Sequence, residues 1–170
     1  SAEAYCREAA AADLAATLFT VPDAATAQGR ELQQVTSATG AELGMHLHPR
    51  FWREHYRNVE QHDCLGGYPA DQQRRLLAAA LEQTAAGLGQ RPLAFRGGNF
   101  SANDSTFALL SELGFTHGSV SQPGRCVPRL KAAWRGACPD VHRAHAAFRL
   151  IPGSLDFVEV PLTSDRTRTD

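Results

Sequence analysis

Short apolar runs alternate with longer Ala- and Leu-rich segments along this chain, and this alternation restricts its fold more than any other feature. The runs that predict strands occupy residues 17–21, 41–48, 92–96, 116–120 and 155–162. The segments that predict helices occupy residues 2–14, 23–38, 69–87 and 101–113. We expect Asp23 to cap the second helix, Gly87 and Gly89 to end the third, and residues 121–153 to be mostly loop. Strands that alternate with helices predict an α/β fold with a mainly parallel sheet.

Length and charge narrow the class of protein. The 170 residues are enough for a single domain, which we place over residues 1–170. The formal net charge of −1 gives no field that would attract nucleic acid or an anionic membrane, so we expect neither as a partner. No apolar run approaches the roughly 20 residues that span a bilayer. Residues 1–12 do not have the pattern of a signal peptide, which favours the cytoplasm, although compartment and oligomeric state stay open.

The first candidate site is the sequence GMHLHP at residues 44–49, at the end of a predicted strand. Residues two apart on a strand point to the same face, so His46 and His48 can direct two imidazoles at one point. Neutral imidazole is a ligand that suits zinc and other borderline divalent metals. The pair therefore predicts a metal site at the edge where parallel sheets place functional groups. Two hydrogen-bonded histidines in a strand-end loop are the alternative.

The second candidate site follows the next predicted strand, where the sequence reads FRGGNF at residues 95–100. The planar guanidinium of Arg96 can hold a carboxylate through two hydrogen bonds, which predicts a catalytic role. Gly97 and Gly98 allow a sharp bend and a close approach to a ligand, and with Asn99 they are candidate substrate-binding residues. The alternative is a salt-bridged arginine beside an ordinary turn.

Glu159 is a carboxylate set between apolar neighbours in the last predicted strand. It is a candidate catalytic base or ligand, and a strand-face charge paired with an arginine is the alternative. Trp52 lies in the long polar connection of residues 50–67 and is a candidate for stacking on a sugar ring or for core packing. The four cysteines form no C-x-x-C pair, and whether Cys126 and Cys138 form a disulfide stays open.

Taken in order, these motifs resemble the polysaccharide deacetylase family, the NodB-homology domains of the carbohydrate esterase 4 type. The resemblance extends over residues 17–163 and rests on ATLFTV (16–21), GAELGMHLHP (40–49), FRGGNF (95–100), LSELGF (110–115) and EVP (159–161). The His-x-His-Pro form resembles a divergent branch, because the common form is His-x-x-x-His. Abundant Ala and Arg indicate a GC-rich bacterial genome.

The resemblance implies an incomplete, distorted (β/α) barrel and one partial deacetylase-like domain. It implies a divalent metal, usually zinc, held by two His and one Asp, with His46 and His48 as the pair. A family Arg that corresponds to Arg96 would orient an Asp base, and a late His would protonate the leaving amine. This chain shows no counterpart of the family's early Asp-Asp or late Leu-x-His motif, so we expect it to be truncated at both ends or degenerate. Two imidazoles without the carboxylate predict weak metal binding and little activity for these residues alone.

The function that the resemblance implies is metal-dependent removal of N- or O-acetyl groups from a carbohydrate, by hydrolysis of linear amide C–N bonds in the N-acetyl case. Two alternatives stay open. The first is a non-catalytic or vestigial carbohydrate-binding domain. The second is another His-x-His hydrolase of the amidohydrolase-like type. The glycan and the identity of the metal are not indicated by the sequence.

Overall fold

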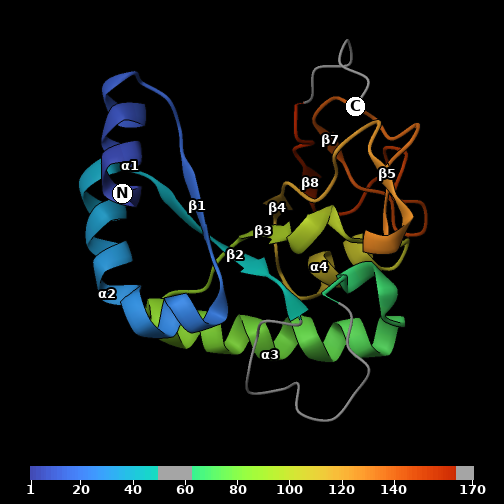
Figure 1. Cartoon of the computed structure of the whole chain (residues 1–170), viewed down its shortest axis with the longest axis horizontal. Coiled ribbons are helices and arrows are strands. Elements are labelled where there is room, and N and C mark those ends of the chain that lie inside the picture. The colour runs from blue at the N-terminus through green and yellow to red at the C-terminus, as the bar shows by residue number, and fades with distance from the viewer. Residues whose placement is uncertain (50–62, 164–170) are drawn as a thin grey trace.

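A mainly parallel sheet organises the protein, whose computed structural model describes residues 1–49 and 63–163 (Figure 1). The strands run in the order β1-β2-β3-β4-β8-β7. They are β1 (Thr17–Thr20), β2 (Glu42–Leu47), β3 (Ala94–Gly97), β4 (His117–Gly118), β7 (His142–Arg143) and β8 (Val158–Glu159). In this sheet the neighbouring strands β1, β2, β3, β4 and β8 are parallel, and β7 runs antiparallel to β8. Within the described residues the sheet is open, with β1 and β7 at its edges. Its mainly parallel strands alternate with helices along the chain, which confirms the predicted α/β class.

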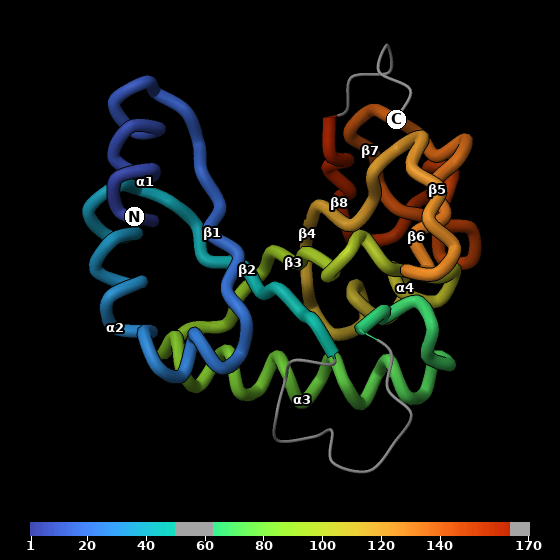
Figure 2. Tube along the Cα trace, in the orientation of Figure 1, coloured from blue at the N-terminus to red at the C-terminus, as the bar shows by residue number. Residues whose placement is uncertain are grey.

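Four α-helices and three short 3₁₀ turns accompany the strands in the described residues. They are α1 (Ala2–Ala11), α2 (Pro22–Thr39), α3 (Ala70–Leu88), α4 (Thr106–Glu112), η3 (Leu65–Gly67), η4 (Gly98–Phe100) and η5 (Pro128–Leu130). Figure 2 shows α3 running along the molecule, with α1 and α2 near one of its ends and the chain after β4 near the other. In the same view, β2 and β3 lie between these two parts of the molecule.

Two glycines allow α2 and α3 to cross with their backbones in contact. A Cβ built on Gly29 would lie 1.9 Å from the carbonyl oxygen of Gly87, and one built on Gly87 would lie 2.5 Å from the backbone of Ala25. No other residue fits at such a crossing without moving a helix. Gly87 therefore lies inside α3, and the prediction that it ends the helix is wrong. Gly89 does end the helix, as predicted, in the left-handed conformation.

The main core lies on one face of β2 and β3. Met45, Leu47 and Phe95 are fully buried there. Helices α3 and α4 supply much of the rest of this cluster: Leu77, Ala80, Leu81, Phe107, Leu109 and Leu110. Because strand side chains alternate between faces, His46 and Arg96, at the intervening positions, point to the other side of the sheet.

The segment 121–153 is mostly loop, as predicted, and contains three short strands among the described residues. Strands β5 (Cys126–Val127) and β6 (Ala132–Ala133) form an antiparallel hairpin, and β7 joins the main sheet. Trp134 follows the hairpin, is fully buried, and donates from Nε1 to the carbonyl oxygen of Phe100 at 2.7 Å. The prediction that this segment is mostly loop is confirmed, and its two-residue strands are too short to show a periodic pattern in the sequence.

Other boundaries differ in smaller ways. Val21 is the N-cap of α2 without a side-chain bond, so the predicted cap at Asp23 is wrong; its carboxylate accepts a hydrogen bond from Gln83 instead. The strands predicted at 116–120 and 155–162 shorten to two residues each. Cys126 and Cys138 are both free thiols.

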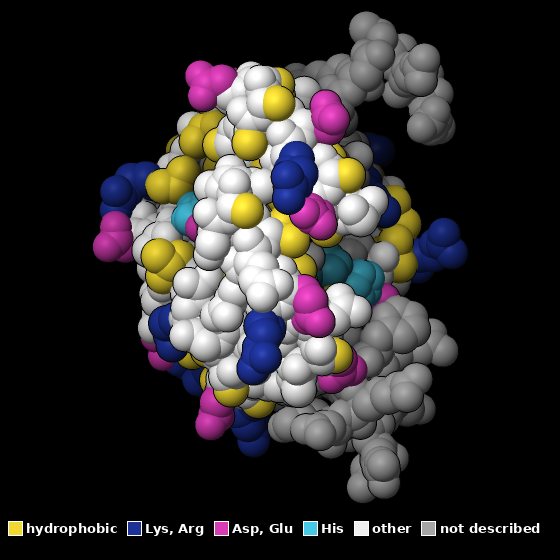
Figure 3. Space-filling view, turned by 90° about the vertical axis from the view of Figure 1, so that its left-hand side faces the viewer, with side chains coloured by type: hydrophobic (Ala, Val, Ile, Leu, Met, Phe, Trp, Pro, Cys, Tyr) yellow, Lys and Arg dark blue, Asp and Glu magenta, His cyan; other side chains and the backbone are white. Residues whose placement is uncertain are grey.

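The surface shows no large region of one charge on the face drawn in Figure 3, where Lys and Arg side chains are interspersed with Asp and Glu. This distribution agrees with the net charge of −1. Across residues 1–49 and 63–163, none of the helices has the length and apolar character that a bilayer crossing requires.

Candidate functional site

The structure brings His46 and His48 together at the C-terminal end of β2. Their ring centroids are 4.7 Å apart and the rings meet edge to face at 76°. His46 is paired in register with Arg96 of β3, so the two predicted sites lie on neighbouring strands. The i, i+2 spacing on an extended segment explains why both rings are on one face of the sheet.

His46 is oriented by the backbone of the neighbouring strand. Its Nδ1 lies 2.9 Å from the carbonyl oxygen of Arg96. A carbonyl only accepts, so Nδ1 carries the proton and the neutral ring has its lone pair on Nε2. Burial of the ring lowers the pKa of His46, and the nearby His48 lowers it further. These effects favour the neutral form of His46, which is the form that binds metals.

His48 is oriented by a carboxylate that sequence reasoning missed. Its Nδ1 lies 3.0 and 2.9 Å from the two carboxylate oxygens of Asp63. Asn99 donates from Nδ2 to Oδ2 of Asp63 at 3.0 Å. Asp63 lies fifteen residues after His48 in the sequence, at the end of a connection without periodicity, so no spacing rule links the two.

The turn after β3 packs against the ring of His48. A Cβ built on Gly98 would lie 2.6 Å from Nδ1 of His48, so only glycine allows the ring to pack there. Asn99 has φ of 58°, a left-handed conformation that Asn tolerates better than most residues. A Cβ on Gly97 would lie 3.2 Å from the carbonyl oxygen of Ser101. The structure thus gives Gly98 and Asn99 supporting contacts to His48 and Asp63, and their predicted substrate contacts stay predictions.

Arg96 is half-buried between two aromatic rings. Its guanidinium carbon lies 4.9 Å from the ring centroid of Phe100 and 5.7 Å from that of Phe19. Burial lowers its pKa, and the negative charge of Glu159 acts in the opposite direction. Within the described part of the chain, Arg96 forms no ion pair with a carboxylate. Its predicted catalytic role stays a prediction.

Glu159 is fully buried at the end of β8 and holds the backbone that leaves β4. Its carboxylate accepts hydrogen bonds from the amide of Val120 at 3.0 Å, the amide of Ser121 at 2.7 Å and the hydroxyl of Ser121 at 2.7 Å. Burial raises the pKa of Glu159 to about 7, and these hydrogen bonds and the charge of Arg96 oppose the shift. The contacts show a structural anchor, and a catalytic role for this carboxylate stays a prediction.

The described residues offer two imidazoles at this site, fewer ligands than a catalytic zinc site uses. Catalytic zinc sites use three protein ligands and a water, and metal-binding histidines donate from the second ring nitrogen to an oxygen acceptor. His46 and His48 both meet the second condition, through the carbonyl of Arg96 and the carboxylate of Asp63. No group of three or more His, Cys, Asp or Glu suited to a metal occurs in residues 1–49 and 63–163. Trp52 lies outside the described residues.

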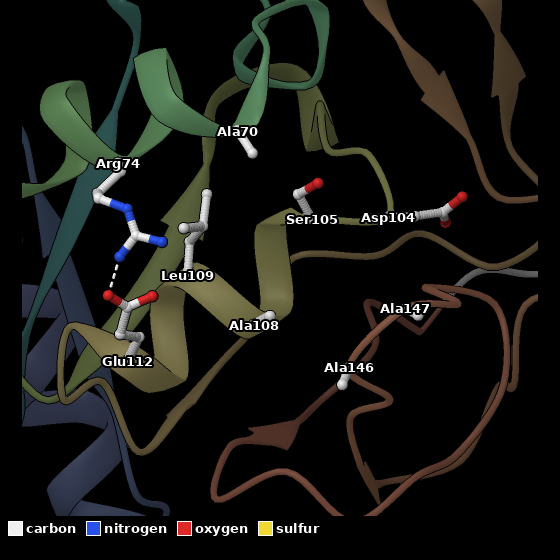
Figure 4. A pocket seen from close by; sticks show the side chains of 9 residues that line it. All are labelled: Ala70, Arg74, Asp104, Ser105, Ala108, Leu109, Glu112, Ala146 and Ala147. Atoms are coloured by element: carbon white, nitrogen blue, oxygen red, sulfur yellow. Dashed lines mark ion pairs between the residues drawn. The ribbon is translucent and has the colours of Figure 1, made fainter.

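A groove elsewhere has little chemistry of its own. Figure 4 shows it between α3, α4 and the segment Ala146–Ala147, with a volume of about 340 Å³. Its wall includes the ion pair between Arg74 and Glu112. Among the described residues that line it, four are alanines and none is a histidine or cysteine. The histidine pair is therefore the stronger candidate site.

Comparisons with known proteins give a likeness of fold. No protein-family model matches the chain, and no curated protein matches it. The crystal structure of a Mycobacterium smegmatis protein assigned as a polysaccharide deacetylase is similar with a TM-score of 0.56 and 19% identity, over 86% of this chain and 40% of that one. The crystal structure of Puue allantoinase gives a TM-score of 0.49 and 18% identity, over 96% of this chain and 44% of that one.

The chain therefore spans less than half the length of either solved structure. The open sheet of the described residues is consistent with an incomplete barrel. At this level of identity the likeness concerns the fold alone.

Proposed function

We propose that this protein is a metal-dependent hydrolase that removes N- or O-acetyl groups from a carbohydrate, with His46 and His48 as metal ligands. One observation carries the proposal: two imidazoles meet at the C-terminal end of β2, each hydrogen-bonded through Nδ1 to an oxygen acceptor. The same fold occurs in a protein assigned as a polysaccharide deacetylase. That fold and an imidazole pair together support hydrolysis better than either does alone.

The chemistry divides between the metal and the chain. A bound divalent metal, zinc as the first choice, supplies Lewis acidity and activates water. Burial lowers the pKa of His46, which favours the neutral imidazole that a metal binds. Arg96 places a positive charge on the adjacent strand, on the face that carries His46, where it can orient a carboxylate or the acyl oxygen of the substrate. Gly97, Gly98, Asn99 and Trp52 are proposed to contact the carbohydrate.

A second candidate function is carbohydrate binding without turnover. The observation in its favour is that the described residues assemble only two metal-binding side chains at this site. Two imidazoles alone leave more of the coordination sphere to water than catalytic zinc sites usually do. This alternative shares the substrate class and differs in the reaction.

The experiment measures acetate release from N-acetylglucosamine oligosaccharides by the full-length protein, with zinc and after removal of metal by a chelator. The proposal expects acetate release that the chelator abolishes and zinc restores. Oligosaccharide binding without acetate release would favour the second candidate. Hydrolysis of small cyclic amides alone, with no action on acetylated sugars, would overturn both.

A further inference from the structure

Asp63 is held at the site by contacts of its side chain and of the segment that follows it. The residues after it form η3, where the amide of Gly66 donates to the hydroxyl of Ser101 at 3.0 Å. Asn103 donates from Nδ2 to the carbonyl oxygen of Gly66 at 3.2 Å. These bonds tie the segment that carries Asp63 to the turn that follows β3. The position of its carboxylate is therefore fixed by the same turn that supports His48.

The carboxylate of Asp63 acts as an acceptor between two donors. Both of its oxygens lie within 3.0 Å of Nδ1 of His48, and Oδ2 also accepts from Asn99. The side chains of His48 and Asp63 are only 26% and 18% exposed, so water competes weakly for these bonds. An ionised carboxylate has no proton to donate, so Nδ1 of His48 must carry one.

We propose that Asp63, itself held by Asn99, is a positioning residue that fixes His48 in the Nδ1–H tautomer and orients its ring. The consequence for metal binding rests on the function proposed above, in which Nε2 of His48 would be the ligand atom. The tautomer itself does not depend on that function and exists without a metal. Outer-shell partners of this kind change metal affinity by roughly 10–100-fold when they are removed.

The test is ¹⁵N NMR of the histidine rings in metal-free protein, followed by a zinc titration of the same samples. Asp63→Asn keeps the size of the side chain but offers an amide that can donate to Nδ1. Asn99→Gly removes the donor that holds Asp63 while tolerating the left-handed backbone. Asp156→Asn is the matched control, because that carboxylate is 94% exposed and pairs only with Arg143 among the described residues.

We expect His48 to be protonated on Nδ1 in the wild type and in Asp156→Asn, and to lose that preference in Asp63→Asn. Asn99→Gly should show a partial loss, and zinc affinity should fall by about 10–100-fold in Asp63→Asn. An Nε2–H tautomer in the wild type, or an unchanged tautomer in Asp63→Asn, would overturn the inference. If no variant or wild type binds zinc but Asp63→Asn still changes the tautomer, the positioning role holds and the metal-dependent function fails.

Discussion

A histidine contacts a carboxylate both at the N-terminal ends and at the C-terminal ends of the parallel strands, and the two pairs differ in what surrounds them. At the N-terminal end, His117 of β4 contacts Oε2 of Glu42 through Nε2 at 3.0 Å, and its Nδ1 lies 2.9 Å from the hydroxyl of Thr116. Thr17 donates to the same carboxylate oxygen at 2.9 Å. This cluster ties together the first residues of β1, β2 and β4.

At the C-terminal end, His48 contacts Asp63 through Nδ1, and a second imidazole lies 4.7 Å away. Both ring nitrogens of His117 contact protein atoms, and the Nδ1 atoms of His46 and His48 contact oxygen acceptors. A histidine–carboxylate pair is therefore no functional signal by itself. The second imidazole, and the strand end where it lies, make the difference.

The largest expected effect is the loss of either imidazole at the C-terminal end. His46→Ala or His48→Ala should lower zinc affinity by more than about 100-fold, beyond the range for outer-shell partners, and should abolish acetate release. His117→Ala is the matched control and should leave both unchanged. Calorimetric zinc titration checks the first expectation, and equal affinity in all three variants would break the comparison.

Removal of Glu159 should have the largest effect on stability. Glu159→Ala leaves two backbone amides and a hydroxyl without their buried acceptor, so the free energy of unfolding should fall by about 2–4 kcal/mol. Glu42→Ala at the other end removes a carboxylate that is 36% exposed and should cost less than about 1 kcal/mol. Urea unfolding measures both, and equal losses would contradict this ranking of the two carboxylates.

The raised pKa of Glu159 predicts that the stability of the protein depends on pH. Burial raises the pKa of Glu159 from 4.5 to about 7, so between these values the folded protein keeps a proton that the unfolded chain releases. The contribution of Glu159 to stability is therefore greatest in acid and is lost as pH rises from 4.5 through about 7. The difference in unfolding free energy between wild type and Glu159→Gln, measured at pH 5 and pH 8, should shift in this direction. A shift of the opposite sign would contradict it.

Gly98→Ala should alter the site more than the fold. The added Cβ would lie 2.6 Å from the ring of His48, and a side chain at a strand end can move where a backbone cannot. We expect zinc affinity to fall by about 10-fold, comparable to the loss of an outer-shell partner, with little change in melting temperature. A large drop in melting temperature with unchanged zinc affinity would show that the ring does not yield.

The smallest effect is expected from the cluster at the N-terminal end. Glu42→Gln weakens a partly exposed contact between a histidine and a carboxylate, which in such settings contributes less than about 1 kcal/mol. Zinc affinity and acetate release should stay as in the wild type. Any loss of zinc binding in this variant would show that the two ends of the sheet are coupled.

Patterns with a local period were enough to predict the parallel sheet and the proximity of the two imidazoles. The alternation of strand and helix segments predicted the parallel sheet, and the i, i+2 spacing of His46 and His48 predicted that their rings lie close together. Asp63 was not predictable in this way, because it lies fifteen residues after His48 and no periodic spacing links the two. Gly87 was misread as a helix end, because its reason is the contact with Gly29 of another helix.

The most direct test of the central claim is X-ray absorption at the zinc edge of the zinc-loaded protein, compared between wild type and His46→Ala. The account predicts two imidazole nitrogens and no sulfur around zinc in the wild type, and one imidazole in the variant. Sulfur from the free cysteines at the metal, or identical spectra for the two proteins, would contradict it.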